Sequence, residues 1–311
     1  MKGRYKYLFG PVPSRRLGKS LGIDLIPYKT CSYNCIYCQL GLTTHQTTER
    51  KEYVPTDEVI KELEQKLAEN VSIDFLTFSG SGEPTLHSDI GKIIRRLKEI
   101  TSLPVAVLTN GSLLFQKKVR EDLLGADVIL PTLSSTNPES FKRIHRPHPS
   151  LRLKDIIQGM IDLRKEFKGE IWLEVFLVQG INDSEEEMQA LKKVIEKIAP
   201  EKIQLNTSVR IPAEEYSLTV PDERMEKLAE ILGEQAEVIS DFDKAEIEEQ
   251  KAGREEILAY LARRPGTLKD IAQGLGIHPD QVMKYINQLL AQKKISARNW
   301  QGKIEYFVPT K

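Results

Sequence analysis

Short apolar runs alternate along residues 21–206 with longer segments in which apolar residues recur at helical spacing. The short runs are rich in β-branched residues, which predicts strands at residues 21–26, 73–78, 105–109, 128–133, 171–178 and 202–206. The longer segments predict helices over about 56–69, 88–100, 116–124, 151–167 and 184–198. This alternation is typical of a parallel sheet, because parallel neighbours need a long crossover connection.

The number of strand and helix units narrows the fold within the α/β class. Six units are too few for a closed eight-stranded barrel, but they fit an open six-stranded (β/α)6 partial TIM barrel. A doubly wound sheet is the alternative that the pattern leaves open. With 311 residues, 40% hydrophobic and 29% charged, the chain is long enough for such a barrel plus a second module.

Residues 253–311 follow a different pattern. Three helical segments precede two short strands that turn near Gln301 and Gly302, and together they resemble a winged helix-turn-helix. We therefore predict a barrel at residues 1–234, an acidic linker at 235–252 and a small winged-helix domain at 253–311.

The charges are unevenly placed along the chain. Residues 251–311 hold 11 Lys and Arg against 5 Asp and Glu, a difference of +6, which leaves −6 on the rest of this neutral sequence. The excess favours a nucleic-acid partner for the winged helix, with protein docking as the alternative. The side chains expected to contact nucleic acid are Gln281, Lys284, Lys293, Arg298 and Lys303.

The location of the protein follows from what the sequence lacks. No apolar run reaches the roughly 18 residues of a membrane-spanning helix, and the charged N-terminus is followed by no secretory signal. We therefore expect a cytoplasmic protein with reduced thiols and no membrane partner.

All three cysteines of the chain, Cys31, Cys35 and Cys38, lie in one predicted loop with the spacing C-x3-C-x2-C. An odd number cannot pair off into disulfides. A structural zinc site needs a fourth ligand, for which the nearby His45 is the candidate. Three thiolates on a 4Fe–4S cluster would instead leave one iron with an open coordination position, as in metal sites that perform chemistry.

With Tyr37 before the last cysteine, the loop resembles the signature of the radical S-adenosylmethionine (SAM) superfamily. The resemblance implies that SAM chelates the open iron through its amino and carboxylate groups. A reductant such as a ferredoxin or flavodoxin would supply an electron that cleaves SAM into methionine and a 5′-deoxyadenosyl radical. The six-stranded partial barrel is the fold that the resemblance implies.

Functional groups of parallel barrels gather at the carboxyl ends of the strands. The second predicted strand is followed by a Ser-Gly-Glu-Pro turn at residues 81–84, similar to the Gly-Gly-Glu-Pro turn that binds the SAM ammonium in the family. The third and fourth strands end near Asn110 and Ser134. These polar residues are also typical of plain turns and helix caps, which need no ligand. From the resemblance we expect the SAM site to contain Tyr37, Gly82, Glu83, Asn110 and Ser134.

Two basic motifs have open interpretations. Arg15 and Arg16 are typical of a solvated or ion-paired loop, and the alternative is an anion site for substrate phosphate or the SAM carboxylate. The His-Arg-Pro-His segment at residues 145–148 is typical of an exposed turn, and the alternative is a loop that reaches the substrate.

The opening segment at residues 9–18 and the SGSGEPTLH segment are most similar to the wyosine-synthase-related branch, whose enzymes modify a guanosine of transfer RNA. Those enzymes carry a second cluster, for which no cysteine remains here. We therefore predict a one-cluster radical SAM enzyme that abstracts hydrogen from an unidentified substrate, with RNA modification as one candidate reaction. The alternatives are an iron–sulfur redox sensor that regulates through nucleic acid and an activase of a partner protein. Loss of the C-terminal module is expected to spare SAM cleavage.

Overall fold

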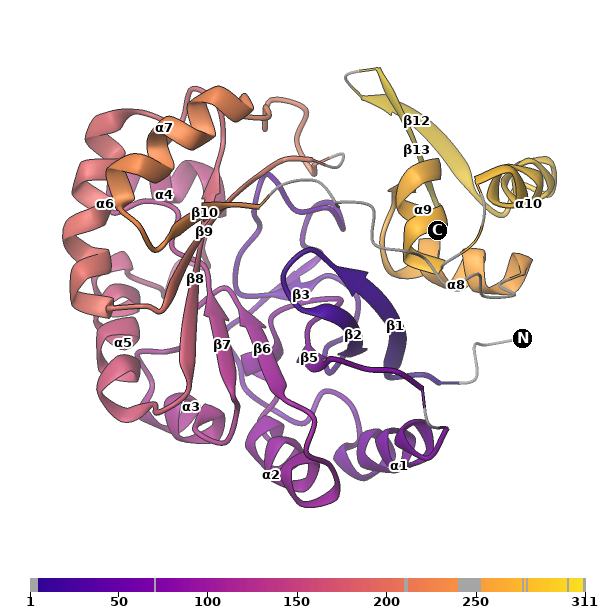
Figure 1. The fold of residues 1–311 in the computed structure, drawn as a ribbon, viewed down its shortest axis with the longest axis horizontal. Coiled ribbons are helices and arrows are strands. Elements are labelled where there is room, and N and C mark those ends of the chain that lie inside the picture. The colour runs from indigo at the N-terminus through magenta and orange to yellow at the C-terminus, as the bar shows by residue number, and fades with distance from the viewer. Residues whose placement is uncertain are drawn as a thin grey trace.

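The computed structural model describes residues 5–69, 71–209, 212–239, 253–275, 277, 279–300 and 302–309. Its main feature is an eight-stranded sheet in the order β1-β2-β5-β6-β7-β8-β9-β10 (Figure 1). Neighbouring strands from β2 to β10 are parallel, and β1 is antiparallel to β2. These strands are β1 (Leu8–Ser14), β2 (Gly18–Ile23), β5 (Phe75–Phe78), β6 (Val105–Thr109), β7 (Val128–Pro131), β8 (Glu170–Leu177), β9 (Lys202–Thr207) and β10 (Ala236–Val238).

Helices connect the parallel strands and lie along the outer side of the sheet (Figure 1). The parallel strands follow their order in the sequence without a reversal, whereas a doubly wound sheet reverses its order at a switch point. The arrangement is the α/β parallel sheet typical of a partial barrel. The helices are α1 (Thr56–Leu67), α2 (Ile90–Ile100), α3 (Lys117–Leu123), α4 (Pro138–His145), α5 (Leu153–Glu166), α6 (Glu185–Ile198) and α7 (Asp222–Leu232), with a short 3-10 helix η1 (Pro84–Leu86).

The six strands predicted from the sequence are present, but the sheet contains eight strands, two more than predicted. β1 contains two prolines and a glycine, which conceal a strand pattern and are tolerated because β1 lies at the edge of the sheet. β10 has three residues, too few for a recognisable pattern. Because β10 pairs with β9, the linker predicted at 235–252 begins too early, and its part from residue 240 lies outside the described residues.

Local side-chain chemistry determines where helices begin. The side chain of Asn137 accepts a hydrogen bond from Glu139 N at 2.9 Å, and Pro138 occupies the first helical position of α4. At α6, Ser184 Oγ accepts from Glu187 N at 3.2 Å. Caps of this kind stabilise a helix by about 1 kcal/mol each.

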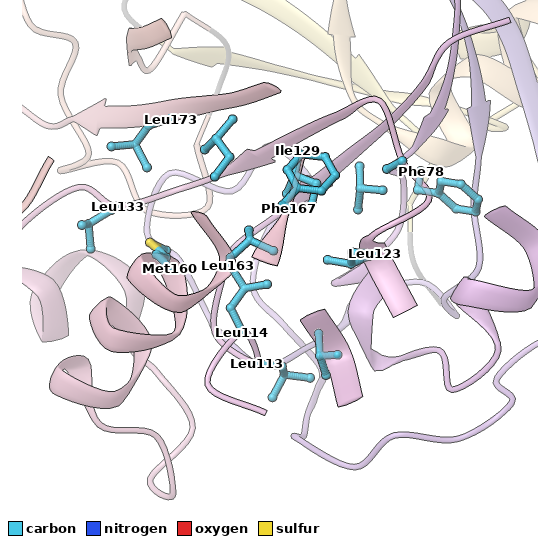
Figure 2. Close-up of a cluster of buried hydrophobic side chains, with 14 of the residues drawn as sticks. Phe78, Leu113, Leu114, Leu123, Ile129, Leu133, Met160, Leu163, Phe167 and Leu173 are labelled. Atoms are coloured by element: carbon cyan, nitrogen blue, oxygen red, sulfur yellow. The ribbon is translucent and has the colours of Figure 1, made fainter. Parts of the chain in front are cut away.

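The main hydrophobic core lies between the sheet and its helices. Figure 2 shows part of it, where Ile129 and Leu173 of the adjacent strands β7 and β8 lie near Leu163 of α5 and the following Phe167. Each fully buried side chain of this size contributes roughly 1.5–3 kcal/mol to stability. The packed core therefore gives the strand ends a rigid support.

Residues from 253 onward form a second module with its own hydrophobic core. The order of its helices and strands is that expected of a winged helix, an assignment that stays a prediction. Its three-stranded sheet has the order β11-β13-β12. The elements are α8 (Arg254–Arg263), β11 (Gly266–Thr267), α9 (Leu268–Leu275), α10 (Pro279–Ala291), β12 (Ser296–Trp300) and β13 (Lys303–Phe307).

The module contacts the first edge of the barrel, where Arg263 Nη2 donates to the Leu8 carbonyl oxygen at 2.9 Å. Of the predicted nucleic-acid contacts, the Gln281 side chain lies outside the described residues, and Arg298 is paired with Glu305 at 2.8 Å. Within the described part of the chain, none of the helices has the length and apolar character needed to span a bilayer.

Candidate functional site

The three cysteines lie in the long connection between β2 and α1. Cys31 ends β3 (Thr30–Cys31), a two-residue strand that pairs in parallel with β4 (His45–Gln46). This pairing closes the intervening segment into a loop, within which Cys38 N donates to the Cys35 carbonyl oxygen at 3.2 Å. The three cysteines thus lie within one closed loop, while His45, the candidate zinc ligand, is exposed on β4.

Burial strongly favours the neutral thiols in this loop. It raises the pKa of Cys31 to about 12, the pKa of Cys35 well above that of a free thiol, and the pKa of Cys38 in the same direction. Negative charge on Cys31 or Cys38 raises the pKa of Cys35 further, because a like charge disfavours the thiolate. Three thiolates here require a strong neighbouring positive charge, which a metal group supplies.

The donor set fits an iron–sulfur cluster. Among the residues that the structure describes, no group of three or more Cys, His, Asp or Glu side chains is arranged to hold a single metal ion. A 4Fe–4S cluster has a different requirement, because each thiolate binds a different iron. Three half-buried cysteines distributed along one loop meet that requirement.

The turn after β5 packs directly on the cysteine loop. Gly82 forms a parallel bridge with Thr30, the residue before Cys31. A Cβ atom at residue 82 would lie 1.8 Å from the Thr30 carbonyl oxygen, so this approach requires glycine. Gly82 therefore sets the separation between the turn and the strand that bears Cys31.

Glu83 is buried, and both of its carboxylate oxygens accept hydrogen bonds from protein groups. Oε1 accepts from Thr85 N at 3.0 Å and from the hydroxyls of Thr85 and Thr109 at 2.6 Å each. Oε2 accepts from Asn110 N at 2.7 Å. Burial raises the pKa of Glu83, and these bonds act in the opposite direction by stabilising the carboxylate. Glu83 thus caps η1 and ties the turn to the end of β6.

Asn110 lies beside the first cysteine rather than standing alone at its strand end. Its Nδ2 atom donates to Cys31 Sγ at 3.5 Å and to Ser32 Oγ at 2.9 Å. Its Oδ1 atom accepts from Ser112 N at 2.9 Å, which fixes the amide orientation. The structure therefore brings Asn110, Glu83 and the cysteine loop into one hydrogen-bonded group.

Tyr37 and Ser134 meet at Phe176, near the end of β8. The Tyr37 and Phe176 rings are stacked with centroids 3.7 Å apart. Ser134 is fully buried, and its Oγ accepts from Phe176 N at 3.3 Å. Tyr37 lines a cleft beside the cysteine loop, whereas the Ser134 hydroxyl is engaged within the barrel wall.

For His145 the sequence favoured an exposed turn, and the structure shows that this prediction was wrong. The residue is fully buried, and its Nδ1 atom lies 3.4 Å from both Cys35 Sγ and the Tyr37 hydroxyl. Burial lowers the pKa of His145 to about 3, so the imidazole is neutral. His145 lies at the end of α4, and its contact with a thiol 110 residues away had no signal in the sequence.

A cleft of about 1610 Å³ opens between the barrel and the C-terminal module. Cys38 and Gly82 line it, as does Arg263 of α8. Arg16 also lines the cleft, but its guanidinium is paired with Glu174 at 2.9 Å. That pairing favours the structural interpretation of Arg16 over an anion site.

Two relatives are examples of proteins similar to this chain over nearly its full length. A protein of Brachyspira hyodysenteriae named GTPase Obg is 42% identical over 99% of this chain, which spans only 46% of that relative's length. A UPF0026 protein of Methanocaldococcus jannaschii is 34% identical, over 96% of this chain and 94% of its own length.

Solved structures show the same fold at low identity. A structure of TYW1 with a lysine-pyruvate adduct has a TM-score of 0.52 at 18% identity, covering 72% of this chain and 75% of that chain. A radical SAM methyltransferase from Sphaerobacter thermophilus has a TM-score of 0.56 at 17% sequence identity, and the match covers 70% of this chain and 65% of that chain. Streptococcus suis SuiB bound to S-adenosylmethionine has a TM-score of 0.54 at 14% sequence identity, and the match covers 77% of this chain and 52% of that chain.

The sequence model of the Radical SAM superfamily matches residues 25–195, more than half of the chain. Members of this family bind a 4Fe–4S cluster and SAM and take electrons from an external reductant. The match contains the three cysteines and the turn that packs on them, within a fold shared by SAM-bound structures, and the chain therefore belongs to the radical SAM superfamily of enzymes.

Proposed function

We propose that this chain holds one 4Fe–4S cluster on Cys31, Cys35 and Cys38 and binds SAM against the turn at residues 80–83. The observation that carries the proposal is the Gly82–Thr30 bridge, because it joins the turn directly to the strand that bears Cys31. When bound and reduced, the cluster supplies the electron that cleaves SAM to methionine and a 5′-deoxyadenosyl radical. A ferredoxin or flavodoxin is the proposed reductant.

The predicted site residues divide into two roles. Gly82 and Tyr37 line the cleft and are the proposed SAM contacts. Glu83 and Asn110 act by positioning, since Glu83 holds the turn to β6 and Asn110 donates to the Cys31 sulfur. Ser134 supports the Phe176 backbone, on whose ring Tyr37 stacks, and we propose that it acts on the SAM site through that contact.

His145 has a defined role toward Cys35 in this proposal. A cysteine that ligates iron is a thiolate and has no proton to donate, so the imidazole must carry its proton on Nδ1 and donate to Cys35 Sγ. Hydrogen bonds to cluster sulfurs help set the reduction potential. His145 therefore stabilises the negative charge that increases when the cluster is reduced.

Replacing His145 by phenylalanine is expected to leave the cluster in place and to lower its reduction potential, because the Cys35 sulfur loses a donor while the buried ring is kept. The potential is measured by titration monitored with electron paramagnetic resonance. The matched control is His148→Phe, since His148 hydrogen-bonds Ser150 instead of a thiol. An equal potential in the His145→Phe variant and the wild type would contradict the assigned role.

The proposed function is tested with the wild-type chain. Anaerobic reconstitution should give about four irons per chain, in line with cysteinyl 4Fe–4S ligation. After reduction, SAM should be converted slowly to methionine and 5′-deoxyadenosine without added substrate, as chromatography would detect. Intact SAM after hours with a folded, iron-loaded and reduced sample would favour the redox-sensor alternative.

RNA is the substrate class that we propose, within the wyosine-synthase-related branch but without wyosine synthesis itself. Lys284, Lys293 and Lys303 are exposed on the C-terminal module, which we assign as a winged helix, and they suit phosphate contacts. RNA that serves as substrate should raise the rate of SAM cleavage. Stimulation by a protein fraction and not by RNA would instead favour the activase alternative.

A further inference from the structure

We propose that the C-terminal module is a working part of the cofactor site, because Arg263 of α8 and the half-buried Asp24 after β2 together position the turn at residues 80–83. Both act as positioning residues, since neither is placed against SAM itself. This inference deepens the proposed function and rests on it, because the turn is the proposed SAM-binding turn.

The Asp24 carboxylate holds this turn directly. Ser81 Oγ donates to Asp24 Oδ2 at 2.5 Å, and Ser81 N donates to Oδ1 at 3.0 Å. A Cβ atom at Gly80 would lie 2.4 Å from the Asp24 carboxyl carbon, so the turn backbone packs against the carboxylate. Hydrogen bonds to an ionised acceptor are shorter and stronger than neutral ones. The position of Asp24 therefore fixes Ser81 and, through it, the adjacent Gly82.

Ser81 is the point at which this chain departs from the Gly-Gly-Glu-Pro turn that it resembles. A glycine has no hydroxyl, so the bond from Ser81 Oγ to Asp24 exists because of the substitution. The serine gives Asp24 a second hydrogen bond from the same residue. The departure thus adds a connection between the turn and β2.

Arg263 reaches the barrel next to Asp24. Its Nη2 atom donates to the Leu8 carbonyl oxygen at 2.9 Å, and its guanidinium lies 5.7 Å from the centre of the Phe9 ring. Leu8 pairs with Ile23, the residue before Asp24. The module therefore places a half-buried positive charge at the strand end where Asp24 lies.

The two charges stabilise each other. Burial raises the pKa of Asp24, whereas the hydrogen bonds from Ser81 and the charge of Arg263 lower it. Burial likewise lowers the pKa of Arg263, and Asp24 opposes that effect. Without the guanidinium, the half-buried carboxylate of Asp24 has less electrostatic support, and a protonated Asp24 would accept less strongly from Ser81.

This connection changes what is expected of the C-terminal module. The sequence indicated that SAM cleavage would not need it. In the structure, Arg263 bonds to Leu8, which pairs with the residue before Asp24, so the Arg263 charge acts on the Asp24 carboxylate by electrostatics, without a direct ion pair. Asp24 in turn bonds directly to Ser81 of the turn. A module that binds substrate could act on SAM binding through the same connection.

The test is amide hydrogen exchange in the full-length, metal-free chain, read by mass spectrometry on peptides that span residues 79–84. Arg263→Gln should increase exchange of this segment roughly three- to tenfold, because the charge that supports Asp24 is lost. Arg263→Lys, which keeps the charge, should restore much of the protection. Arg254→Gln removes an exposed arginine from the same helix and should leave the segment unchanged.

Two further measurements separate positioning from general damage. Peptides from β6 and α5 should exchange as in the wild type in every variant. In cluster-loaded enzyme, Arg263→Gln should raise the KM for SAM about fivefold or more while kcat changes less than twofold, the pattern of lost binding. Unchanged exchange at residues 79–84 in Arg263→Gln would overturn the inference. The exchange result does not depend on SAM cleavage, so a failure of the proposed function would be seen separately.

Discussion

Replacing any one of Cys31, Cys35 and Cys38 by alanine is expected to abolish the cluster and, with it, all reductive cleavage of SAM. The chain has three cysteines in total, so no spare thiol can take the place of the one removed. Two remaining thiolates would leave two irons without protein ligands, and the family's chemistry requires an assembled cluster. Iron content, the visible absorption of the reconstituted protein and 5′-deoxyadenosine production measure the effect.

Because the cysteines are half-buried and pack on the core, these variants need a folding control. A cysteine-to-alanine change removes one sulfur atom and should leave secondary structure intact, as circular dichroism would record. The matched control is Leu42→Ala, because Leu42 is exposed in the same loop and should not affect iron binding. A single alanine variant that binds about four irons and cleaves SAM at the wild-type rate would show that the cluster is held elsewhere.

The Gly82→Ala variant is expected to have the second largest effect. The new Cβ atom would lie 1.8 Å from the Thr30 carbonyl oxygen and 2.6 Å from Ile26 Cγ2, so the turn and the cysteine loop must move apart. The obstacle is a backbone atom, which cannot rotate away as a flexible side chain can. We expect a loss of about 1–3 kcal/mol in the free energy of unfolding. The displacement of Cys31 should also lower iron loading. The rate of SAM cleavage should fall at least tenfold, which corresponds to an increase of about 1.4 kcal/mol or more in the activation free energy.

A second glycine of the same barrel provides the control. Gly125 is exposed, and a Cβ atom there would meet only the side chain of Ile94 at 3.1 Å. Gly125→Ala should therefore keep the iron content and the activity of the wild type. Normal iron loading and SAM cleavage in Gly82→Ala would mean that the turn does not determine the position of the cysteine loop.

The sequence by itself determined the fold class and the grouping of the three cysteines in one loop. Apolar runs of strand length recur between amphipathic helices, and a parallel sheet follows because the periodicity of each element is a local property. The same holds for the cysteine spacing, since three thiols within eight positions must lie near one another in any fold. The two edge strands were missed because β1 is interrupted by proline and β10 is short.

Only the tertiary structure decided what surrounds that loop. His145 contacts Cys35 across 110 residues, Asp24 binds Ser81 across 57, and Arg263 reaches Leu8 across 255. Glu83 and Asn110 acquire their hydrogen bonds in the same way, because each meets partners brought from other strand ends. Periodicity and spacing describe neighbours along the chain, whereas these contacts depend on how neighbouring strands align in the sheet and on where the C-terminal module meets its edge. Such contacts have no local pattern, and the folded structure alone reveals them.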